Sequence, residues 1–512
     1  MSEIKTPPGG SVGAPAGPSP LRETVVVAEP SMAAGATSLR RNTLSMPEVL
    51  AQSVANMAPS AAMALLPLLV FLNAANGTWL AFVVAIITMV CVGYCASQFA
   101  RKMNSAGGFY VWVTRGFGPA AGHAAGWGLL LGYLVTGIAT TLGFAIFGGD
   151  FINRITGLDA TNRYLVTALL AVDTILPIVV AIADMRLSAR TSLTLESISV
   201  AIIVILCVAI WIAKGPIDGN QLTFSGVVPG GILVGVTLAI FAFVGFESAG
   251  SLGMEAKNPQ RNIGRAIIYS ALMVGIFYVV VSYSQVLGFQ GTDKFAKSNA
   301  PMPDLAGVVG LGFLAPIIDI GIVCSMFACT LACINAGARM LLTMSHDEIG
   351  HAILKRTHKT RQTPHVAIWV VGVPMFVLPA VFVLGGRSAV DVTGWAGTLA
   401  TFGFMLGYGL VSAAAPVSLR RSGEATPLVW LAGVVGAASM VIVFYASWLP
   451  TTIPFFGKYF SPLANPYDKL PYVFFAWAAV GILWFALVRA RNPEAARQIG
   501  RRYESHEVAS AS

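Results

Sequence analysis

The sequence predicts an all-α integral membrane protein with twelve transmembrane helices, on three observations. First, 56% of the 512 residues are hydrophobic and only 11% are charged, whereas soluble domains carry about 25% charged residues. Second, twelve segments are apolar over ~20 residues, which is the length of a helix that crosses a ~30 Å hydrocarbon core. Third, Lys and Arg gather on alternate loops between these segments.

The twelve segments divide the chain into a core and flanking parts. Residues 1–46 are rich in Pro, Gly, Ala and Ser and lack the apolar run of a signal peptide, so we expect a disordered N-terminal tail. Residues 47–418 hold a ten-helix core, residues 419–488 hold helices 11 and 12, and residues 489–512 form a C-terminal tail. The predicted helices lie near residues 49–74, 77–100, 118–148, 163–183, 189–213, 228–255, 266–289, 313–343, 365–385, 389–417, 428–449 and 471–488.

The orientation follows from the positive charges, because cytoplasmic loops keep an excess of Lys and Arg. With both ends inside the cell, the cytoplasmic side holds three of every four of the 32 Lys and Arg residues. The excess persists from loop to loop, and the loss or gain of one helix would scramble it. We therefore expect a multi-pass protein of the cell inner (cytoplasmic) membrane, with both termini cytoplasmic.

Composition and spacing also argue against several classes of function. The net charge of +9 comes from short basic clusters between apolar segments, and the sequence holds no nucleic-acid-binding module. All six cysteines fall inside apolar segments without a His or carboxylate at metal-ligand spacing, so we expect no disulfide framework and no metal site. There is no nucleophile–base pair and no phosphate-binding Gly-x-x-x-x-Gly-Lys-Ser/Thr loop. We expect neither an enzyme nor a cofactor.

Two of the predicted helices are interrupted near their middle. The first carries Asn56-Met-Ala-Pro-Ser-Ala61, in which Pro59 removes a backbone donor and clashes with the preceding turn. The sixth carries Phe241-Ala-Phe-Val-Gly-Phe-Glu247, followed by Gly250 and Gly253. Broken first helices in two five-helix halves are typical of inverted repeats that bind a solute between them. Pro and Gly also occur in membrane helices that only kink or pack closely, and this alternative stays open.

Three motifs resemble the amino acid–polyamine–organocation permease superfamily. The run Phe243-Val-Gly-Phe-Glu-Ser-Ala-Gly-Ser-Leu-Gly-Met-Glu-Ala-Lys-Asn-Pro-Gln-Arg-Asn-Ile-Gly-Arg265 is similar to the signature of its sixth helix. Residues 107–119 with Gly126-Trp127 are similar to the lead-in to its third helix. Residues 335–340, with His346-Asp347 and Thr363-Pro364, resemble the end of its eighth helix and the next loop. The motifs occur in the family's order, and the resemblance covers roughly residues 45–490.

The resemblance implies a bacterial permease with a leucine-transporter-type fold. Helices 1–5 and 6–10 would form an inverted repeat, helices 1 and 6 would be discontinuous around a midplane substrate site, and helices 11 and 12 would lie outside. A substrate amine would meet carbonyls of helix 6 and a carboxylate would meet amides of helix 1, because C-terminal helix ends favour cations and N-terminal ends favour anions. The residues that the resemblance assigns to this site are Ala58, Pro59, Ser60, Ala61, Phe241, Ala242, Phe243, Val244 and Gly245, with Tyr133 of helix 3.

Phe241 matches the family's gating aromatic, with Phe243 as a second candidate, and ordinary packing is the alternative for each. Family members that bind α-amino acids usually have a Gly-x-Gly type break in helix 1, whereas this chain has Ala58-Pro59-Ser60-Ala61. That version looks closer to the branch that contains putrescine and related amine importers. The substrate class therefore stays open.

Four carboxylates fall within predicted helices: Asp173, Glu196, Glu247 and Asp319. A charge near the bilayer centre costs about 2.5 to 3.5 kcal/mol, so each needs a reason. Glu247 matches a family position associated with proton coupling, and a structural hydrogen bond at the break is its alternative. For Glu196 the sequence allows a proton carrier or an ion pair with Arg190 or another cation near the cytoplasmic end, with the pair slightly favoured. For Asp173 and Asp319 we expect hydration or pairing.

These observations favour a secondary active transporter that imports an amino acid or related small amine by proton symport and alternating access. An exchanger of the same fold is the first alternative, and a channel or a non-transporting sensor is the alternative from another class. A channel would show a continuous polar stripe or a ring of like charges, and the helices carry only isolated acids. The expected partners are the solute, a proton and the lipid bilayer; the oligomeric state stays open.

Overall fold

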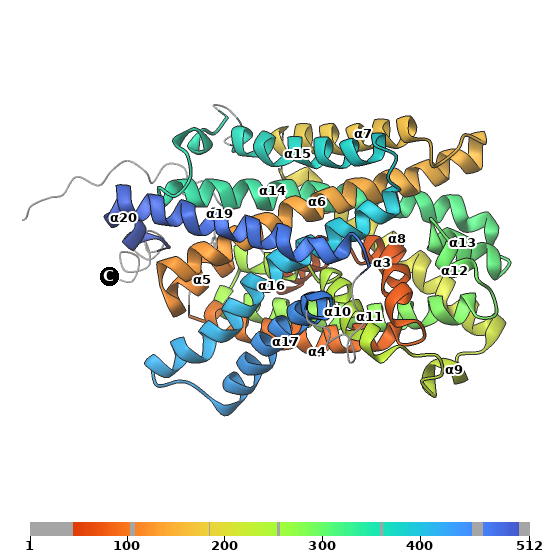
Figure 1. The fold of residues 1–512 in the computed structure, drawn as a ribbon, viewed down its shortest axis with the longest axis horizontal. Coiled ribbons are helices and arrows are strands. Elements are labelled where there is room, and N and C mark those ends of the chain that lie inside the picture. Colours follow the sequence, from red (N-terminus) through yellow and green to blue (C-terminus); the bar gives the residue numbers. More distant parts are fainter. Residues whose placement is uncertain are drawn as a thin grey trace, which may run out of the picture. The chain divides into compact units, whose positions relative to one another are not determined.

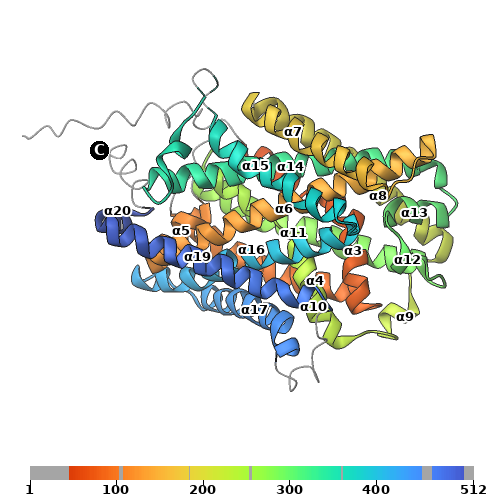
Figure 2. The same cartoon turned by 45° about the horizontal axis from the view of Figure 1, so that its top comes forward.

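A computed structural model of the chain describes residues 45–102, 108–183, 185–252, 256–358, 361, 363–452 and 464–500. Its described elements are helices, together with one isolated bridge between Ala75 and Val227. Figures 1 and 2 show most of the long helices running roughly along one direction. The first half holds α2 (Met46–Met57), α3 (Pro59–Ala74), α4 (Thr78–Ala100), α5 (Gly108–Phe117), α6 (Pro119–Thr156), α7 (Arg163–Ala183) and α8 (Met185–Lys214).

The rest of the chain repeats this arrangement and then extends it. After the short α9 (Gly219–Leu222) come α10 (Pro229–Phe241), η1 (Phe246–Leu252), α11 (Pro259–Phe289), α12 (Lys294–Lys297), α13 (Pro301–Val308), η2 (Gly312–Leu314), α14 (Ala315–His346), η3 (Ala352–Lys355), α15 (His365–Leu384) and α16 (Ala389–Arg421). The last helices are α17 (Pro427–Thr452), η4 (Tyr467–Lys469), α19 (Leu470–Arg491) and α20 (Pro493–Gln498).

The number of membrane helices agrees with the twelve predicted from the sequence when the two short helices α2 and α3 are counted as one broken helix. Within the described residues, eleven helical stretches are long and apolar enough to span a membrane. The twelfth is the pair α2 and α3, of 12 and 16 residues, which meet at Ala58. One of the eleven stretches, Pro229–Gly250, is itself interrupted after Phe241. The prediction of twelve helices with breaks in the first and the sixth is therefore confirmed.

Packing between the helices has the symmetry of an inverted repeat. Equivalent helices of the two halves lie against each other: α3 on α10, α2 on η1, α4 on α11, α6 on α14, and α7 on α15. The fifth helix of the first half, α8, packs on α11 and α14, and its counterpart α16 packs on α4 and α6. The short helices α5 and α13 show the same symmetry. α5 contacts η1 in the second half, and α13 contacts α3 in the first half. Each contact thus has a partner in the other half, as the predicted five-plus-five repeat requires.

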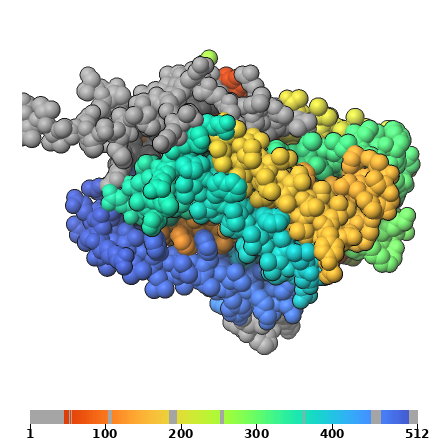
Figure 3. Space-filling model, turned by 90° about the horizontal axis from the view of Figure 1, so that it is seen from above, coloured from red at the N-terminus to blue at the C-terminus, as the bar shows by residue number. Residues whose placement is uncertain are grey.

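Helices α17 and α19 lie outside the repeat, as predicted. α17 packs on α16, α4 and α10, and α19 packs on α16 and α6. In Figure 3, α19 (blue) and α15 (cyan to teal) run along the face that is drawn. Large apolar side chains on these helices are exposed, for example Ile482 at 69% and Leu483 at 65%. Exposed apolar surface of this extent fits contact with lipid.

Small residues set the distance between the two longest core helices, α6 and α16. A Cβ atom added to Gly403 would lie 2.5 Å from the carbonyl oxygen of Gly128, and one added to Gly128 would lie 2.7 Å from the oxygen of Gly403. Membrane helices gain little from hydrophobic burial against each other, so close backbone approach at small residues is a main source of their packing energy. This contact fixes α6 and α16, which carry two of the side chains of the candidate site.

Candidate functional site

The first break is a single residue between α2 and α3. Ala58 adopts the left-handed conformation, with φ 45° and ψ 61°, which costs an L-residue roughly 1–2 kcal/mol. Pro59 is the first residue of α3, where its missing N–H and fixed φ fit a helix start. The chain therefore leaves α2 and starts a new helix, and the amide groups at the start of α3 are left without partners inside their own helix.

The second break replaces regular α-helix by tight turns after Phe241. Short-range hydrogen bonds join the amide of Phe243 to the oxygen of Ile240 and the amide of Val244 to the oxygen of Phe241. Gly245 has φ +106°, a conformation that L side chains rarely adopt, and η1 follows it. The hydroxyl of Tyr278, on α11, donates to the carbonyl oxygen of Ala242 at 2.6 Å. A side chain of another helix thus satisfies a carbonyl at the break.

The two breaks lie directly against each other. A Cβ atom on Gly245 would lie 2.5 Å from the carbonyl oxygen of Asn56, at the end of α2. The hydroxyl of Ser53 in α2 also donates to the carbonyl oxygen of Phe246 at 2.8 Å. The irregular backbones of both halves therefore meet at one place in the interior, which is the arrangement that the sequence pattern predicted for a solute site.

Glu247 joins the second break to two other helices. Its Oε1 accepts from the hydroxyl of Tyr133 (α6) at 2.8 Å, and its Oε2 accepts from the hydroxyl of Tyr408 (α16) at 2.8 Å and from the amide of Gly245 at 3.0 Å. The residue is 5% exposed. An ionised carboxylate can accept all three of these hydrogen bonds. The amide of Gly245 can only donate, whereas either tyrosine hydroxyl can also accept, so protonation of Glu247 would reverse the role of one tyrosine hydroxyl.

Glu196 occupies the start of α3. It projects from α8 and accepts from the amide of Ser60 at 2.7 Å and, through its other oxygen, from the hydroxyl of Ser325 on α14. An acidic group at a helix N-terminus is stabilised by the free amides and the helix dipole. The ion pair with Arg190 stays a prediction, because the side chain of Arg190 lies outside the described residues.

The remaining predicted site residues surround these two carboxylates in different ways. Ala58, Pro59, Ser60, Ala61, Ala242, Val244 and Gly245 form the two breaks themselves and are buried. Tyr133 points to Glu247. The ring of Phe243 packs edge-on against Tyr278, with ring centres 5.1 Å apart. Phe241 is 9% exposed and lies beside Gly397 of α16, where an added Cβ would be 3.2 Å from the ring. Phe241 therefore lies against α16, whereas Phe243 contacts α11.

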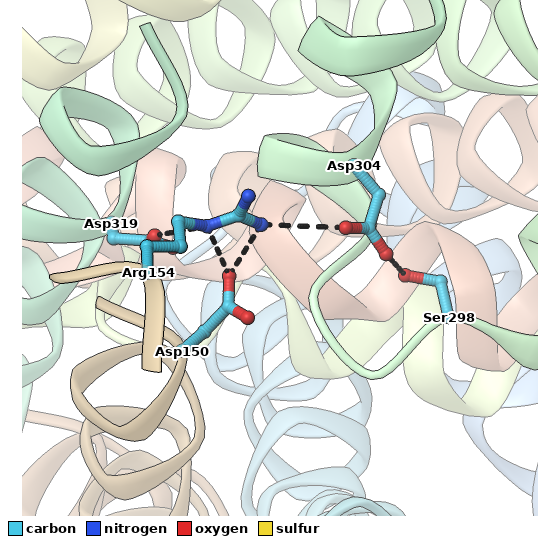
Figure 4. A network of polar contacts seen from close by, with 5 residues as sticks. All are labelled: Asp150, Arg154, Ser298, Asp304 and Asp319. Carbon is cyan, nitrogen blue, oxygen red and sulfur yellow. Dashed lines mark hydrogen bonds and ion pairs between the residues drawn. The ribbon is translucent and has the colours of Figure 1, made fainter. Parts of the chain in front are cut away.

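A second polar network lies at the end of α6 (Figure 4). Arg154 contacts three carboxylates: Asp150 at 2.6 Å, Asp319 of α14 at 3.1 Å and Asp304 of α13 at 3.4 Å. The hydroxyl of Ser298 donates to Asp304 at 2.6 Å. Asp319 is thus paired, which is one of the two expectations for it. The sequence prediction ended this helix at residue 148, so the i,i+4 pair of Asp150 and Arg154 fell in a loop and was missed.

Asp173 belongs to a separate buried chain of hydroxyls. It lies on α7 and accepts from Thr330 of α14 at 2.7 Å, and Thr330 lies 2.8 Å from the hydroxyl of Thr140 on α6. These contacts tie together three helices that do not carry the breaks. Among the described residues no group of three or more His, Cys, Asp or Glu is placed to hold a metal ion.

Sequence reasoning missed four residues whose hydroxyls contact the breaks or their two carboxylates, namely Ser53, Tyr278, Ser325 and Tyr408. Only Tyr408 carried a local signal, because it stands alone between Gly407 and Gly409 on an apolar helix. A phenol that replaces a small side chain at a helix crossing needs a partner for its hydroxyl. The other three are ordinary serine or tyrosine residues, and their roles follow only from the fold.

Two interrupted helices that meet inside a symmetric pair of five-helix repeats are the architecture of many membrane transporters. The chain belongs to the amino acid permease family, whose model matches residues 48–496. This confirms the resemblance seen in the sequence.

Individual relatives are distant. The chain is 27% identical over 313 residues to the branched-chain amino acid permease BcaP of Bacillus subtilis (strain 168), a match that spans 59% of this chain and 66% of that protein. It is 26% identical over 366 residues to an uncharacterized transporter of Mycobacterium tuberculosis (strain ATCC 25618 / H37Rv), over 71% of this chain and 77% of that one. A solved structure of a Na+-coupled sialic acid symporter aligns with a TM-score of 0.47 and 15% identity, over 78% of this chain and 89% of that one.

The contact between the breaks predicts the effect of Gly245→Ala. The new Cβ would face a positive φ and would also lie 2.5 Å from the oxygen of Asn56, so the breaks must separate. Gly157→Ala is the matched control, because Gly157 has φ +75° with nothing within 4 Å of the added atom. We expect the control to lose about 1 kcal/mol of stability from backbone strain alone and Gly245→Ala to lose clearly more. Thermal unfolding in detergent measures both, and equal shifts would contradict the contact.

Proposed function

We propose that this protein is a proton-coupled importer of amino acids that works by alternating access. Membership of the amino acid permease family supports the amino acid, and the observation that carries the mechanism is the meeting of the two breaks beside Glu196 and Glu247. The relative from Bacillus subtilis, named as a branched-chain amino acid permease, favours a substrate with an apolar side chain. The expected residues of the site are those of the two breaks, with Phe241 as the gate and Tyr133 as part of the wall.

In this proposal the substrate lies between the breaks. Its ammonium group binds carbonyl oxygens around Ala242–Gly245, at the end of α10, and its carboxylate binds amides at the start of α3. Glu196 already accepts from the amide of Ser60. Two carboxylates at one helix start repel each other, and the repulsion is strong where water is excluded. Glu196 must therefore take up a proton before or while the substrate carboxylate binds, and this exchange couples the proton to the solute.

Glu247 serves a different step. It holds the second break to α6 and α16 through Tyr133 and Tyr408. Protonation turns one carboxylate oxygen into a donor, so a tyrosine hydroxyl must reverse from donor to acceptor or the amide of Gly245 must lose its partner. This exchange of hydrogen bonds loosens the unit of η1 and α2, which pack on each other, from α6 and α16. Release of this unit is the movement that opens the site to the other side of the membrane.

We further propose the orientation that the Lys and Arg distribution favours. Both termini, including residues 1–46 and 489–512, face the cytoplasm, and the membrane is the cell inner membrane. The core of residues 47–418 carries transport, and the two helices of residues 419–488 flank it. Arg154 and its three acidic partners then lie toward the outer face.

Uptake into proteoliposomes tests the proposed activity. With radiolabelled leucine, isoleucine and valine outside and a more acidic exterior, we expect accumulation that collapses when a protonophore is added. A panel of other amino acids and of putrescine, tested in the same way, defines the substrate class. Uptake that depends only on a substrate loaded inside would instead assign an exchanger. No uptake of any of these solutes under any gradient would refute transport.

The position of Glu196 predicts how substrate binding depends on pH. For the wild-type protein we expect amino acid affinity to rise as pH falls, by at most about tenfold per pH unit, the limit for one linked proton. Glu196→Gln mimics the protonated form, so its affinity should be high and constant with pH. Glu424→Gln is the control, because Glu424 is a 60% exposed partner of Lys102 and should keep the wild-type profile. Isothermal titration calorimetry at several pH values measures all three, and a sloping profile in Glu196→Gln would exclude this role.

The contacts of Glu247 predict a different phenotype for Glu247→Gln. The amide cannot carry a proton, so proton-driven accumulation should be lost while substrate affinity stays within a few-fold of wild type. Tyr408→Phe removes one donor but keeps the carboxyl, and we expect it to accumulate substrate at a reduced rate. Parallel binding and uptake measurements separate the two effects. Full accumulation by Glu247→Gln would remove this residue from the coupling mechanism.

A further inference from the structure

A cavity lined by arginines lies away from the breaks, where the end of α4 meets the start of α11. Its volume is about 320 Å³, and its polar lining is Ser97, Arg101, Gln260, Arg261 and Arg265. The helices cross closely beside it, because a Cβ atom on Gly264 would lie 3.0 Å from Cβ of Ser97. This crossing brings the arginine of one helix end next to the two arginines of the other.

The three arginines have no acidic partner among the residues that the structure describes. The neighbouring Lys102, in contrast, pairs with Glu424 at 2.8 Å. Arg261 and Arg265 are four residues apart on α11 and so lie on one face of the helix. The positive end of the 31-residue α11 adds to the field of the arginines, and the negative end of α4 offsets part of it. A concave site lined by three arginines fits a phosphate group, which guanidinium groups bind in a bidentate manner.

The surroundings of the cavity favour a lipid as the source of that phosphate. Two helices that are long and apolar enough to span a membrane meet here, since α4 ends at Ala100 and α11 begins at Pro259. We therefore expect the cavity near the edge of the hydrocarbon region. Ile268 also lines it. Beyond it, exposed apolar side chains continue along the same face of α11 at helical spacing, at Tyr269, Leu272, Met273 and Ile276. A headgroup in the cavity would place its acyl chains along this stripe.

We propose that this cavity binds the headgroup of an anionic phospholipid. Basic pockets between membrane helices on the cytoplasmic side bind such headgroups through charge and shape together. The bound lipid would join α4 to α11, which pack on the broken helices through η1 and α2. It would therefore stabilise the pair of helices that supports the site, whatever solute is carried.

Titration of the purified full-length protein with lipids tests the proposal. We expect dioleoylphosphatidylglycerol to bind in native mass spectrometry and to raise the unfolding temperature, and dioleoylphosphatidylcholine and inorganic phosphate to do neither. In R101Q/R261Q/R265Q we expect about a hundredfold weaker binding of the anionic lipid, since each basic residue near an anionic group contributes roughly fivefold. The control R489Q/R491Q/R497Q removes the same charge from exposed positions at the other end of the chain and should bind like wild type.

If the triple variant folds poorly, a single variant and the phosphate titration still test whether the cavity binds the lipid. Arg261→Gln alone changes one exposed side chain in the first turn of α11 and should weaken the anionic lipid about fivefold. Unchanged affinity in both the single and the triple variant would refute the site. An equal rise in unfolding temperature with inorganic phosphate would assign a free anion instead of a lipid, and an equal loss in the control variant would assign a non-specific charge effect.

Discussion

Backbone groups that leave a helix inside a membrane must find other hydrogen-bond partners, because lipid offers none. In this protein the partners are side chains, three of them from other helices. Glu196 accepts from the amide of Ser60, Tyr278 donates to the oxygen of Ala242, Ser53 donates to the oxygen of Phe246, and Glu247 accepts from the amide of Gly245. The two breaks exist because these four contacts are available, and the rest of the core positions the helices that provide them.

The side chains that contact the breaks and their carboxylates come from several helices of both halves. Glu196 comes from α8 and Tyr278 from α11, whereas Glu247 is itself held by α6 and α16. A movement of either broken helix must therefore exchange several hydrogen bonds at once, which favours two discrete arrangements over a continuous range. Two of the acceptors are carboxylates, and protonation changes the number of hydrogen bonds that they accept. In the proposed mechanism, these two carboxylates couple the conformation of the broken helices to protonation.

The sequence predicts the parts of this structure that depend on local signals. Hydropathy locates the membrane helices, and Pro59 and Gly245 mark the breaks, because their backbone effects act within one turn. The partners of the carboxylates cannot be predicted in this way. Ser60 and Glu196 are 136 residues apart, and Tyr408 and Glu247 are 161 residues apart, so only the packed fold brings them together. The network of Arg154 was not predicted from the sequence for a different reason. Charged residues end an apolar segment in a hydropathy reading, although α6 continues to Thr156.

The contact of Glu196 also bears on the substrate class that the sequence left open. The break in the first helix has alanines where amino acid binders of the family usually have glycines, and a carboxylate of the chain already binds the start of α3. An α-amino acid brings a second carboxylate to that position, so it binds best when Glu196 is neutral. A simple amine brings only a positive charge, which an ionised Glu196 would attract. Under the proposed mechanism we therefore expect the two classes to have opposite pH dependence at Glu196, with lower pH strengthening amino acid binding and weakening amine binding. The protonation state of Glu196, rather than the shape of the break alone, would then decide which class the site accepts.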